Sequence, residues 1–365
     1  MIADDFIQFG ILRAAMKVML IISVPIHPGT DKLARTLAKA GYEVRVLRWD
    51  RQCLGVITTK HDNYITDMVQ LKAPSGNGAV MLYWLKWWSA EYHKINEFKP
   101  DVVHCLNWDT LLPAILAKRM LGCKVIYQAL DSLGGSYNGK LKLRIPARMI
   151  EKLTAKWADE IFVVSEPFLD IFHRGIVIYN ISEDTGVNPK SKEGRFTLFY
   201  GGNISDARLI RKVAVATKML GVRFVLAGKE MDVGVIDYAV SQGAEYIGVI
   251  SHDELIRQTL ESDAIICLSD MRIPDFRMSM PNKLFESMMC GKPIIVTIGT
   301  PMAKVVDREH CGVVLQNVSE LARALSFLKI DGARLGQNGR EAYERRYNWA
   351  TESKKLLEVY EQWSL

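Results

Sequence analysis

A chain of 365 residues is longer than a single hydrophobic core usually serves, and this length predicts two domains. With 49% apolar residues, 24% charged residues, 26 Gly and 12 Pro, the composition excludes a disordered, collagen-like or low-complexity protein. The net charge of +6 arises entirely in residues 1–180; because it is dispersed, it argues against a genomic DNA binder but permits an anionic surface or substrate.

The cysteines and the N-terminus bear on the compartment. The six cysteines form no C-x-x-C pair and mostly lie in apolar runs, which predicts reduced, buried thiols, a cytoplasmic protein and no metal site. No apolar stretch approaches the ~18 residues of a membrane-spanning helix, and Asp4 and Asp5 stand where a secretory signal carries positive charge. Residues 1–15 are taken as an extension to which we assign no function.

The first half alternates short apolar runs with amphipathic segments. A strand at 16–24 leads through a Pro/Gly/Asp loop at 25–31 into a helix at 32–40 and a second strand at 43–47, a βαβ unit that predicts a parallel sheet. The pattern continues with a helix at 84–98, a strand at 101–106, a helix at 111–121, a strand at 124–130, a helix at 145–156 and a strand at 160–165.

A polar loop at 180–192 interrupts this alternation, and we place the domain boundary there, with domains at 1–184 and 185–348. The alternation then resumes with strands at 195–200, 223–228, 245–249, 264–269 and 293–297, helices at 207–220, 253–261 and 283–290, and a terminal helix at 349–365. Two doubly wound α/β domains are the simplest architecture, with ligands bound in a cleft lined by the loops that follow the strands.

Two loops after strands in the second half are suited to a phosphate. Gly201-Gly202-Asn203 follows a buried strand and precedes Arg208 at a predicted helix start, so that backbone and guanidinium can both approach an anion. A tight turn with a solvated arginine explains the same residues. Lys229, after the next strand, is a second candidate cation or a solvated lysine.

The most informative stretch runs from Met280 to Pro293. Pro281 and Asn282 suit a helix start, and Lys283 and Glu286 then lie three residues apart on one helical face. A salt bridge between them is the simple explanation. The alternative is a nucleotide site, because a helix start favours an anion and a carboxylate one turn in can accept hydrogen bonds from both ribose hydroxyls.

The segment SMPNKLFESMMCGKPIIV resembles the donor-nucleotide signature of retaining glycosyltransferases of the GT-B fold, in particular glycosyltransferase family 4. Further similar segments occur in the family's order, among them PDVVHCLNWDTLLPAILAKRMLGCKVIY, FYGGNISDARLI, YIGVISHDELIRQTLESDAIICLS and YNWATESKKLLEVY. The resemblance implies two Rossmann-like domains facing across a cleft, with the terminal helix crossing back to the first domain.

The resemblance also implies roles for individual residues. Glu286 would bind the donor ribose, Arg208 and Lys283 would neutralise the diphosphate, and Gly202 would let it approach the backbone. The remaining donor-site residues would be Gly29 near the phosphate, Val249 and Ile250 beside the base, and Asn203, Lys229, Pro281 and Asn282.

The chain departs from the family pattern around the sugar. Met278 stands eight positions before Glu286, where the family usually has a second glutamate, and Leu106 and Leu130 stand where histidines are common. His104, at the end of an apolar strand, is predicted to be a packed histidine. The catalytic candidates are therefore the nearest polar groups, Asn107 and Asp131.

The implied activity is a retaining, metal-independent hexosyl transfer from a nucleotide diphosphate sugar to a glycolipid, lipid-linked or polysaccharide acceptor, without a cofactor. One alternative is a non-catalytic partner subunit of the same fold, suggested by Met278, Leu106 and Leu130. Another is a sugar-nucleotide epimerase, which needs a water-activating carboxylate and catalytic histidines that the sequence does not place.

Aromatic and basic residues in the first half raise the question of a membrane surface. Trp84, Trp87 and Trp88 fall on one helical face, which is more often core than membrane anchor, and residues 140–148 carry four basic residues without an acid. We hypothesise that the first domain binds an anionic membrane from the cytoplasmic side.

Overall fold

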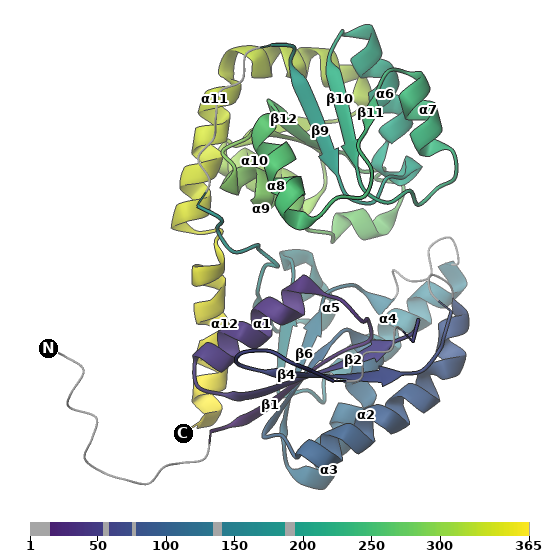
Figure 1. Cartoon of the computed structure of the whole chain (residues 1–365), viewed down its shortest axis with the longest axis vertical. Helices are drawn as coiled ribbons and strands as arrows, with labels where there is room; N and C mark the ends of the chain where they lie inside the picture. Colours follow the sequence, from purple (N-terminus) through teal and green to yellow (C-terminus); the bar gives the residue numbers. More distant parts are fainter. Residues whose placement is uncertain (1–14, 54–57, 75–77, 134–140, 187–193, 365) are drawn as a thin grey trace, which may run out of the picture. The chain divides into compact units, whose positions relative to one another are not determined.

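The computed structural model describes residues 15–53, 58–74, 78–133, 141–186 and 194–364. The chain divides into two compact units, one formed by the residues up to Phe162 together with Val359–Leu365 and the other by Val163–Glu358. The described residues form two sheets, and the neighbouring strands of each are mostly parallel. The expected fold class, two parallel α/β sheets, is therefore confirmed (Figure 1).

The first sheet has eight strands within the described part of the chain, in the order β3-β4-β2-β1-β5-β6-β7-β8. Strands β4, β2, β1, β5 and β6 pair in parallel, and β3 pairs antiparallel with β4 at the edge. The bounds in chain order are Lys17–Ile22, Glu43–Asp50, Thr58–Lys60, Ile65–Gln70, Val102–Leu106, Lys124–Ala129, Glu160–Val163 and Ile176–Val177.

Right-handed crossovers place α1 (Pro28–Lys39) on one face of this sheet and α2 (Trp84–Phe98), α3 (Leu111–Leu121) and α4 (Leu141–Ala155) on the other. Figure 1 shows α1 opposite α2 and α3. Helices α2 and α3 have the predicted bounds. Helix α1 begins four residues before its predicted start, because the His27 side chain caps it by accepting a hydrogen bond from Thr30 N (3.1 Å).

Aromatic residues fill the space between the first sheet and α2. Trp87 is fully buried and stacks on Trp49 with 5.3 Å between ring centroids, and Trp84 and Trp88 both pack against Trp108. The three tryptophans of α2 therefore pack inward, as the core interpretation predicted.

His104 is also a packed residue, as predicted. Its side chain is fully buried between the Tyr360 hydroxyl (2.8 Å) and Gln128 Oε1 (3.0 Å), and burial lowers its pKa to about 3. The six cysteines are free thiols, five of them buried and Cys53 exposed.

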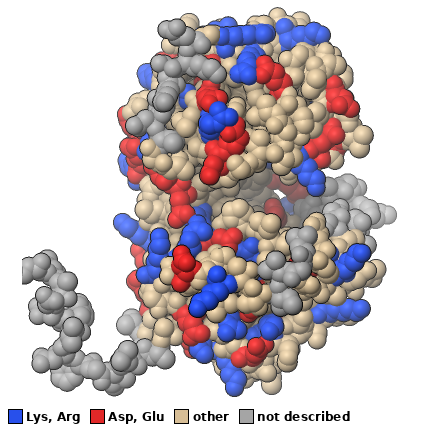
Figure 2. Space-filling model, in the orientation of Figure 1, with Lys and Arg blue, Asp and Glu red and all other residues tan. Residues whose placement is uncertain are grey.

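The second sheet is parallel, with strand order β11-β10-β9-β12-β13-β14. Its strands are β9 (Thr197–Gly201), β10 (Arg223–Ala227), β11 (Glu245–Tyr246), β12 (Ala264–Cys267), β13 (Ile294–Thr297) and β14 (Gly312–Leu315). The helices after β7 are α5 (Leu169–Phe172), α6 (Ile210–Met219), α7 (Val235–Ser241), α8 (His252–Glu261), α9 (Lys283–Met289), α10 (Pro301–Glu309), α11 (Leu321–Arg345) and α12 (Trp349–Ser364). Figure 2 shows basic and acidic side chains interspersed on the visible face of this unit.

The division between the units lies before the boundary expected at 184/185. Tyr179 and Ile181 belong to the buried core of the second unit, where the Tyr179 ring contacts Phe285 and Tyr347. Residues 187–193 of the expected linker lie outside the described residues. Helix α12 is shared, because residues 349–358 belong to the second unit and the following residues to the first.

No helix in the described ranges is both long and apolar enough to cross a membrane. Within the same ranges, no three His, Cys, Asp or Glu side chains come close enough together to hold a metal ion.

Candidate functional site

Glycine backbones from three loops meet at the carboxyl edge of the second sheet. Gly202 N donates to Ala227 O and Gly228 N donates to Gly248 O, both at 2.8 Å, which ties the loops after β9, β10 and β11 together. Gly202 and Gly228 have φ values of 131° and 129°, which L side chains rarely adopt, and a Cβ on Gly228 would lie 1.9 Å from Gly202 O. Only glycine at position 228 lets the first two loops approach this closely.

Lys283, the first residue of α9, reaches over the first of these loops. Its ammonium group lies 4.9 Å from the centroid of the Tyr200 ring, and a Cβ on Gly202 would meet that ammonium at 2.6 Å. Burial lowers the pKa of Lys283, and the nearby Arg208 contributes in the same direction. The structure thus brings Gly202 and Lys283 together, as predicted, with a desolvated cation directly above the Gly202 backbone.

Arg208 is the second cation of the site. Its guanidinium donates from Nη1 to Ser269 Oγ at 2.8 Å and lies over the Phe276 ring, 4.4 Å from the centroid. The predicted helix at 207–220 was wrong at its start, because Arg208 ends a 3-10 turn and α6 begins only at Ile210. Leu209 separates the two with a left-handed φ of 56°, which breaks the helical hydrogen-bond pattern.

Glu286 lies one turn into α9 and is 6% exposed. The salt bridge expected between Glu286 and Lys283 is wrong, because among the described residues no ion pair joins them. The imidazole of His252 approaches Glu286 instead, with its Nδ1 3.8 Å from Oε1. Burial raises the pKa of Glu286, opposed by Lys283 and His252. A small pocket is lined by Phe199, Gly201, Leu255, Thr259, Ile265, Lys283 and Glu286.

The other second-unit candidates border this centre less directly. Asn203 accepts a hydrogen bond from the Tyr200 hydroxyl through its backbone oxygen (2.5 Å), and Lys229 is exposed. Val249 is 73% exposed, whereas Ile250 packs against the core. Pro281 and Asn282 immediately precede α9, where the Asn282 side chain makes no capping hydrogen bond.

The three first-unit candidates follow β1, β5 and β6 in the chain. Gly29 is in the first turn of α1. Asn107 has a positive φ of 74°, and its Oδ1 accepts hydrogen bonds from the backbone N–H groups of Leu130 and Asp131, each at 3.1 Å. This gives Asn107 a role in holding the loop after β6, while the Asp131 side chain is exposed.

Four further residues shape the second-unit site and were not predicted from the sequence: His252, Ser269, Tyr200 and Phe276. Ser269 could have been found, because it lies two residues after β12 and the carboxyl ends of parallel strands share one edge. His252 is the first residue of α8, and its side chain contacts Glu286 of α9. No spacing in the sequence predicts a contact between these two helices.

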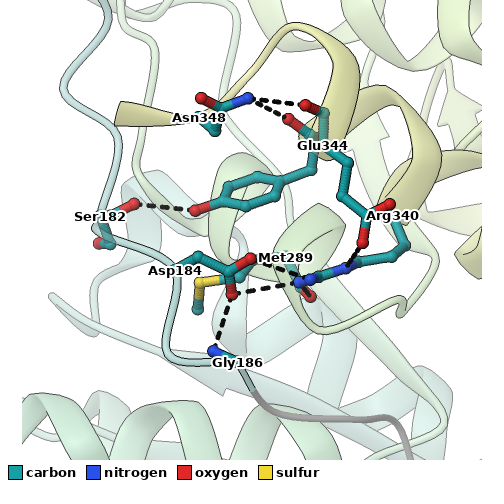
Figure 3. A network of polar contacts seen from close by, with 8 residues as sticks. Ser182, Asp184, Gly186, Met289, Arg340, Glu344 and Asn348 are labelled. Atoms are coloured by element: carbon teal, nitrogen blue, oxygen red, sulfur yellow. Dashed lines mark hydrogen bonds and ion pairs between the residues drawn. The ribbon is translucent and has the colours of Figure 1, made fainter. Parts of the chain in front are cut away.

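Arg340 of α11 supports α9 from its other end (Figure 3). Its guanidinium donates to Met289 O at 2.7 Å, pairs with Asp184 at 2.9 Å and with Glu344 at 2.7 Å. Tyr343, one turn along α11, donates to Ser182 O at 3.0 Å. The end of α9 and the segment 182–186 are therefore held by the same helix.

Replacing Arg340 with Ala is expected to destabilise the second unit by about 1–3 kcal/mol, because a buried carbonyl and a carboxylate both lose a charged donor. Chemical denaturation monitored by fluorescence measures this loss. Arg345→Ala is the matched control, since its side chain is 67% exposed and its partner Glu309 also pairs with Arg308. Equal losses in both variants would show that the Arg340 network adds no stability.

Two family models match the chain. One, described as a glycosyl transferase 4-like domain, matches residues 26–180, and one described as glycosyl transferases group 1 matches residues 204–331. Together they span most of both halves. A search of the curated proteins gave no match.

Several solved structures share the whole fold. Sucrose-phosphate synthase from Thermosynechococcus elongatus is 17% identical with a TM-score of 0.81, covering 95% of this chain and 98% of that one. HepE from Anabaena, solved with UDP and glucose, is 14% identical with a TM-score of 0.71, covering 95% and 100%. WaaG, a glycosyltransferase involved in lipopolysaccharide biosynthesis, is 14% identical with a TM-score of 0.65, covering 93% and 98%.

Proposed function

The chain belongs to the glycosyltransferases of the GT-B fold, and we propose that it moves a hexosyl group from a nucleotide diphosphate sugar to a glycolipid, lipid-linked or polysaccharide acceptor. The observation that carries this proposal is the meeting of Lys283, Arg208 and Glu286 around the Gly202 backbone at one edge of the second sheet. Two cations beside a backbone free of side chains suit a diphosphate, and a buried carboxylate suits a ribose diol.

In the proposed complex, the diphosphate lies along Gly202 and takes charge-assisted hydrogen bonds from Lys283 and Arg208. Phe276 and Ser269 fix the direction of the guanidinium, and the Tyr200 ring supports the ammonium. Glu286 accepts hydrogen bonds from the ribose hydroxyls, and Ile250 and Val249 border the base. Because these contacts hold both cations in place, little reorganisation is needed at the moment of reaction.

The proposed transfer breaks the bond between the sugar C1 and the diphosphate oxygen and forms a bond from C1 to an acceptor hydroxyl oxygen. The electron pair of the broken bond leaves with the nucleoside diphosphate, where Arg208 and Lys283 stabilise the added negative charge. The acceptor attacks from the face that the diphosphate leaves, a phosphate oxygen takes its proton, and the anomeric configuration is retained. We propose that these two cations make a metal ion unnecessary and that no cofactor takes part.

The first donor to test is a uridine diphosphate sugar, because the similar HepE fold was solved with UDP and glucose. A lipid-linked acceptor is the first acceptor class to test, because WaaG is involved in lipopolysaccharide biosynthesis.

The alternative function is a non-catalytic partner subunit, and Met278 favours it. The Met278 carbonyl accepts a hydrogen bond from Ser165 Oγ at 2.5 Å, while its thioether is at most a weak acceptor for sugar hydroxyls. In this alternative, the nucleotide site is retained for binding alone.

Donor consumption by Arg208→Met tests the proposed function. With the preferred nucleotide sugar and an acceptor extract, wild-type protein is expected to release nucleoside diphosphate, and the variant to do so about a hundredfold more slowly, because one preorganised charge is lost. Arg211→Met is the matched control, three residues away on the exposed surface with its own partner, Asp206. If wild-type protein binds nucleotide yet consumes none of the UDP, GDP or ADP sugars with any acceptor extract, the partner-subunit function replaces the enzyme.

A further inference from the structure

Large apolar side chains are exposed along two neighbouring helices of the first unit. We call this surface the α3–α4 face. It comprises Leu116, Met120, Ile145, Met149, Leu153 and Trp157, each between 49% and 67% exposed. Side chains of this size are ordinarily buried when they gather on one surface, so the face indicates a contact with something apolar.

The face is continuous across both helices. Ile145, Met149 and Leu153 recur every four residues and therefore form one stripe along α4, whose opposite side is buried. Helix α3 packs beside α4. Where they meet, the Arg119 guanidinium lies over the Trp157 ring at 5.3 Å, and the Lys118 ammonium donates to Trp157 O at 3.0 Å.

The charge that accompanies these side chains is positive. Residues 111–121 and 145–157 contain five basic residues, namely Lys118, Arg119, Arg148, Lys152 and Lys156, of which Lys118 is paired with Asp159 at 2.8 Å. Their one acid is Glu151, which is fully buried and accepts hydrogen bonds from the Tyr127 hydroxyl (2.7 Å) and Leu133 N (3.0 Å). The side chains of residues 141–144 are not among those described. From residue 145 onward, the exposed charge of α4 is therefore basic.

We propose that the α3–α4 face binds the surface of an anionic lipid bilayer. An apolar stripe bordered by Lys and Arg, with a Trp at its end, can bury its apolar groups at the acyl boundary while the cations reach lipid phosphates. A second copy of the chain fits less well, because two such faces would bring like charges together. The tryptophans of α2 take no part, since they pack inward.

This inference deepens the proposed function and rests on it for its purpose, which is to bring the enzyme to a lipid-linked acceptor. The binding itself needs no donor, so the two can fail separately. If the protein consumes donor but does not bind vesicles, the proposed membrane surface is wrong and the proposed enzyme activity stands. If it binds vesicles but consumes no donor, the proposed enzyme activity is wrong and the membrane surface stands.

Flotation of the full chain with vesicles tests the proposal. Wild-type protein is expected to float with phosphatidylcholine vesicles that contain phosphatidylglycerol and to stay unbound with phosphatidylcholine alone. For the double variant Met149→Glu/Leu153→Glu, we expect a partition coefficient onto the anionic vesicles about tenfold lower than that of wild type, because both side chains would enter the lipid. Added salt should weaken wild-type binding as it screens the basic residues.

Met219→Glu with Ile330→Glu is the matched control, because it makes the same chemical change at two side chains of the second unit that are 82% and 88% exposed. Circular dichroism and nucleotide binding confirm that each variant is folded. The proposal is overturned if wild-type protein ignores anionic vesicles, or if the Met149/Leu153 variant binds them as well as wild type does. Self-association of wild type without vesicle binding, abolished in the same variant, would identify a second copy as the occupant and also overturn it.

Discussion

Replacing Glu286 with Gln is expected to weaken nucleoside diphosphate binding about tenfold to a hundredfold, the equivalent of one hydrogen bond to a charged group at about 1.5–3 kcal/mol. The carboxylate can accept from both ribose hydroxyls, whereas the amide offers a single acceptor oxygen. Isothermal titration or ligand-induced thermal stabilisation with UDP, GDP and ADP measures the change and also identifies the base.

A 2′-deoxynucleoside diphosphate makes this test specific for the ribose. Wild-type protein should lose affinity for the deoxy ligand, and Glu286→Gln should show little further loss, because the partner hydroxyl is already missing. Glu254→Gln is the matched control on α8, where the carboxylate pairs with Arg257 at the surface. Equal discrimination against the deoxy ligand in wild type and Glu286→Gln would place the ribose away from Glu286.

Replacing Gly228 with Ala is expected to destabilise the second unit by about 2–5 kcal/mol and to abolish nucleotide binding in whatever protein remains folded. The new Cβ would lie 1.9 Å from Gly202 O, and the φ of 129° is strained for any L residue. Either the β10 loop moves away or the Gly202 backbone does. Thermal unfolding with and without nucleoside diphosphate measures both effects.

Gly221→Ala separates the clash from the loss of glycine as such. Gly221 also has a positive φ, 63°, but a Cβ there meets no atom within 4 Å. The expected cost is about 1 kcal/mol, with nucleotide binding unchanged. If the two alanine variants were equally stable, the close approach of the two glycine loops would not be a requirement of the fold.

Much of the fold was predictable because its sheets are parallel and buried. Such strands are short apolar runs, and helices such as α2 and α3 were found with their observed bounds. Helix α11 was not predicted, and its glycines explain why. A Cβ on Gly336 would lie 2.1 Å from Gly291 O, so the residues that weaken the helical pattern are those that let α11 approach the end of α9.

The predicted site residues lie close together where one rule applied, namely that loops after parallel strands share an edge. This rule, with the family signature, placed Gly202, Arg208, Lys283 and Glu286 in one region, and the structure joins them. It did not predict the partner of Glu286, because His252 approaches from α8. It also did not predict the engagement of Asn107 with the next loop, which depends on a left-handed backbone at that residue.

The hydrogen bond between His104 and Tyr360 joins residues 256 positions apart within the first unit. A ribosome adding about 5–20 residues per second leaves roughly 10–50 s between the synthesis of the two. During that interval His104 and strand β5 lack the turn of α12 that carries Tyr360, while the whole second unit emerges and can fold. The nascent first unit therefore stays incomplete until the second unit has been made and the turn of α12 that carries Tyr360 follows it.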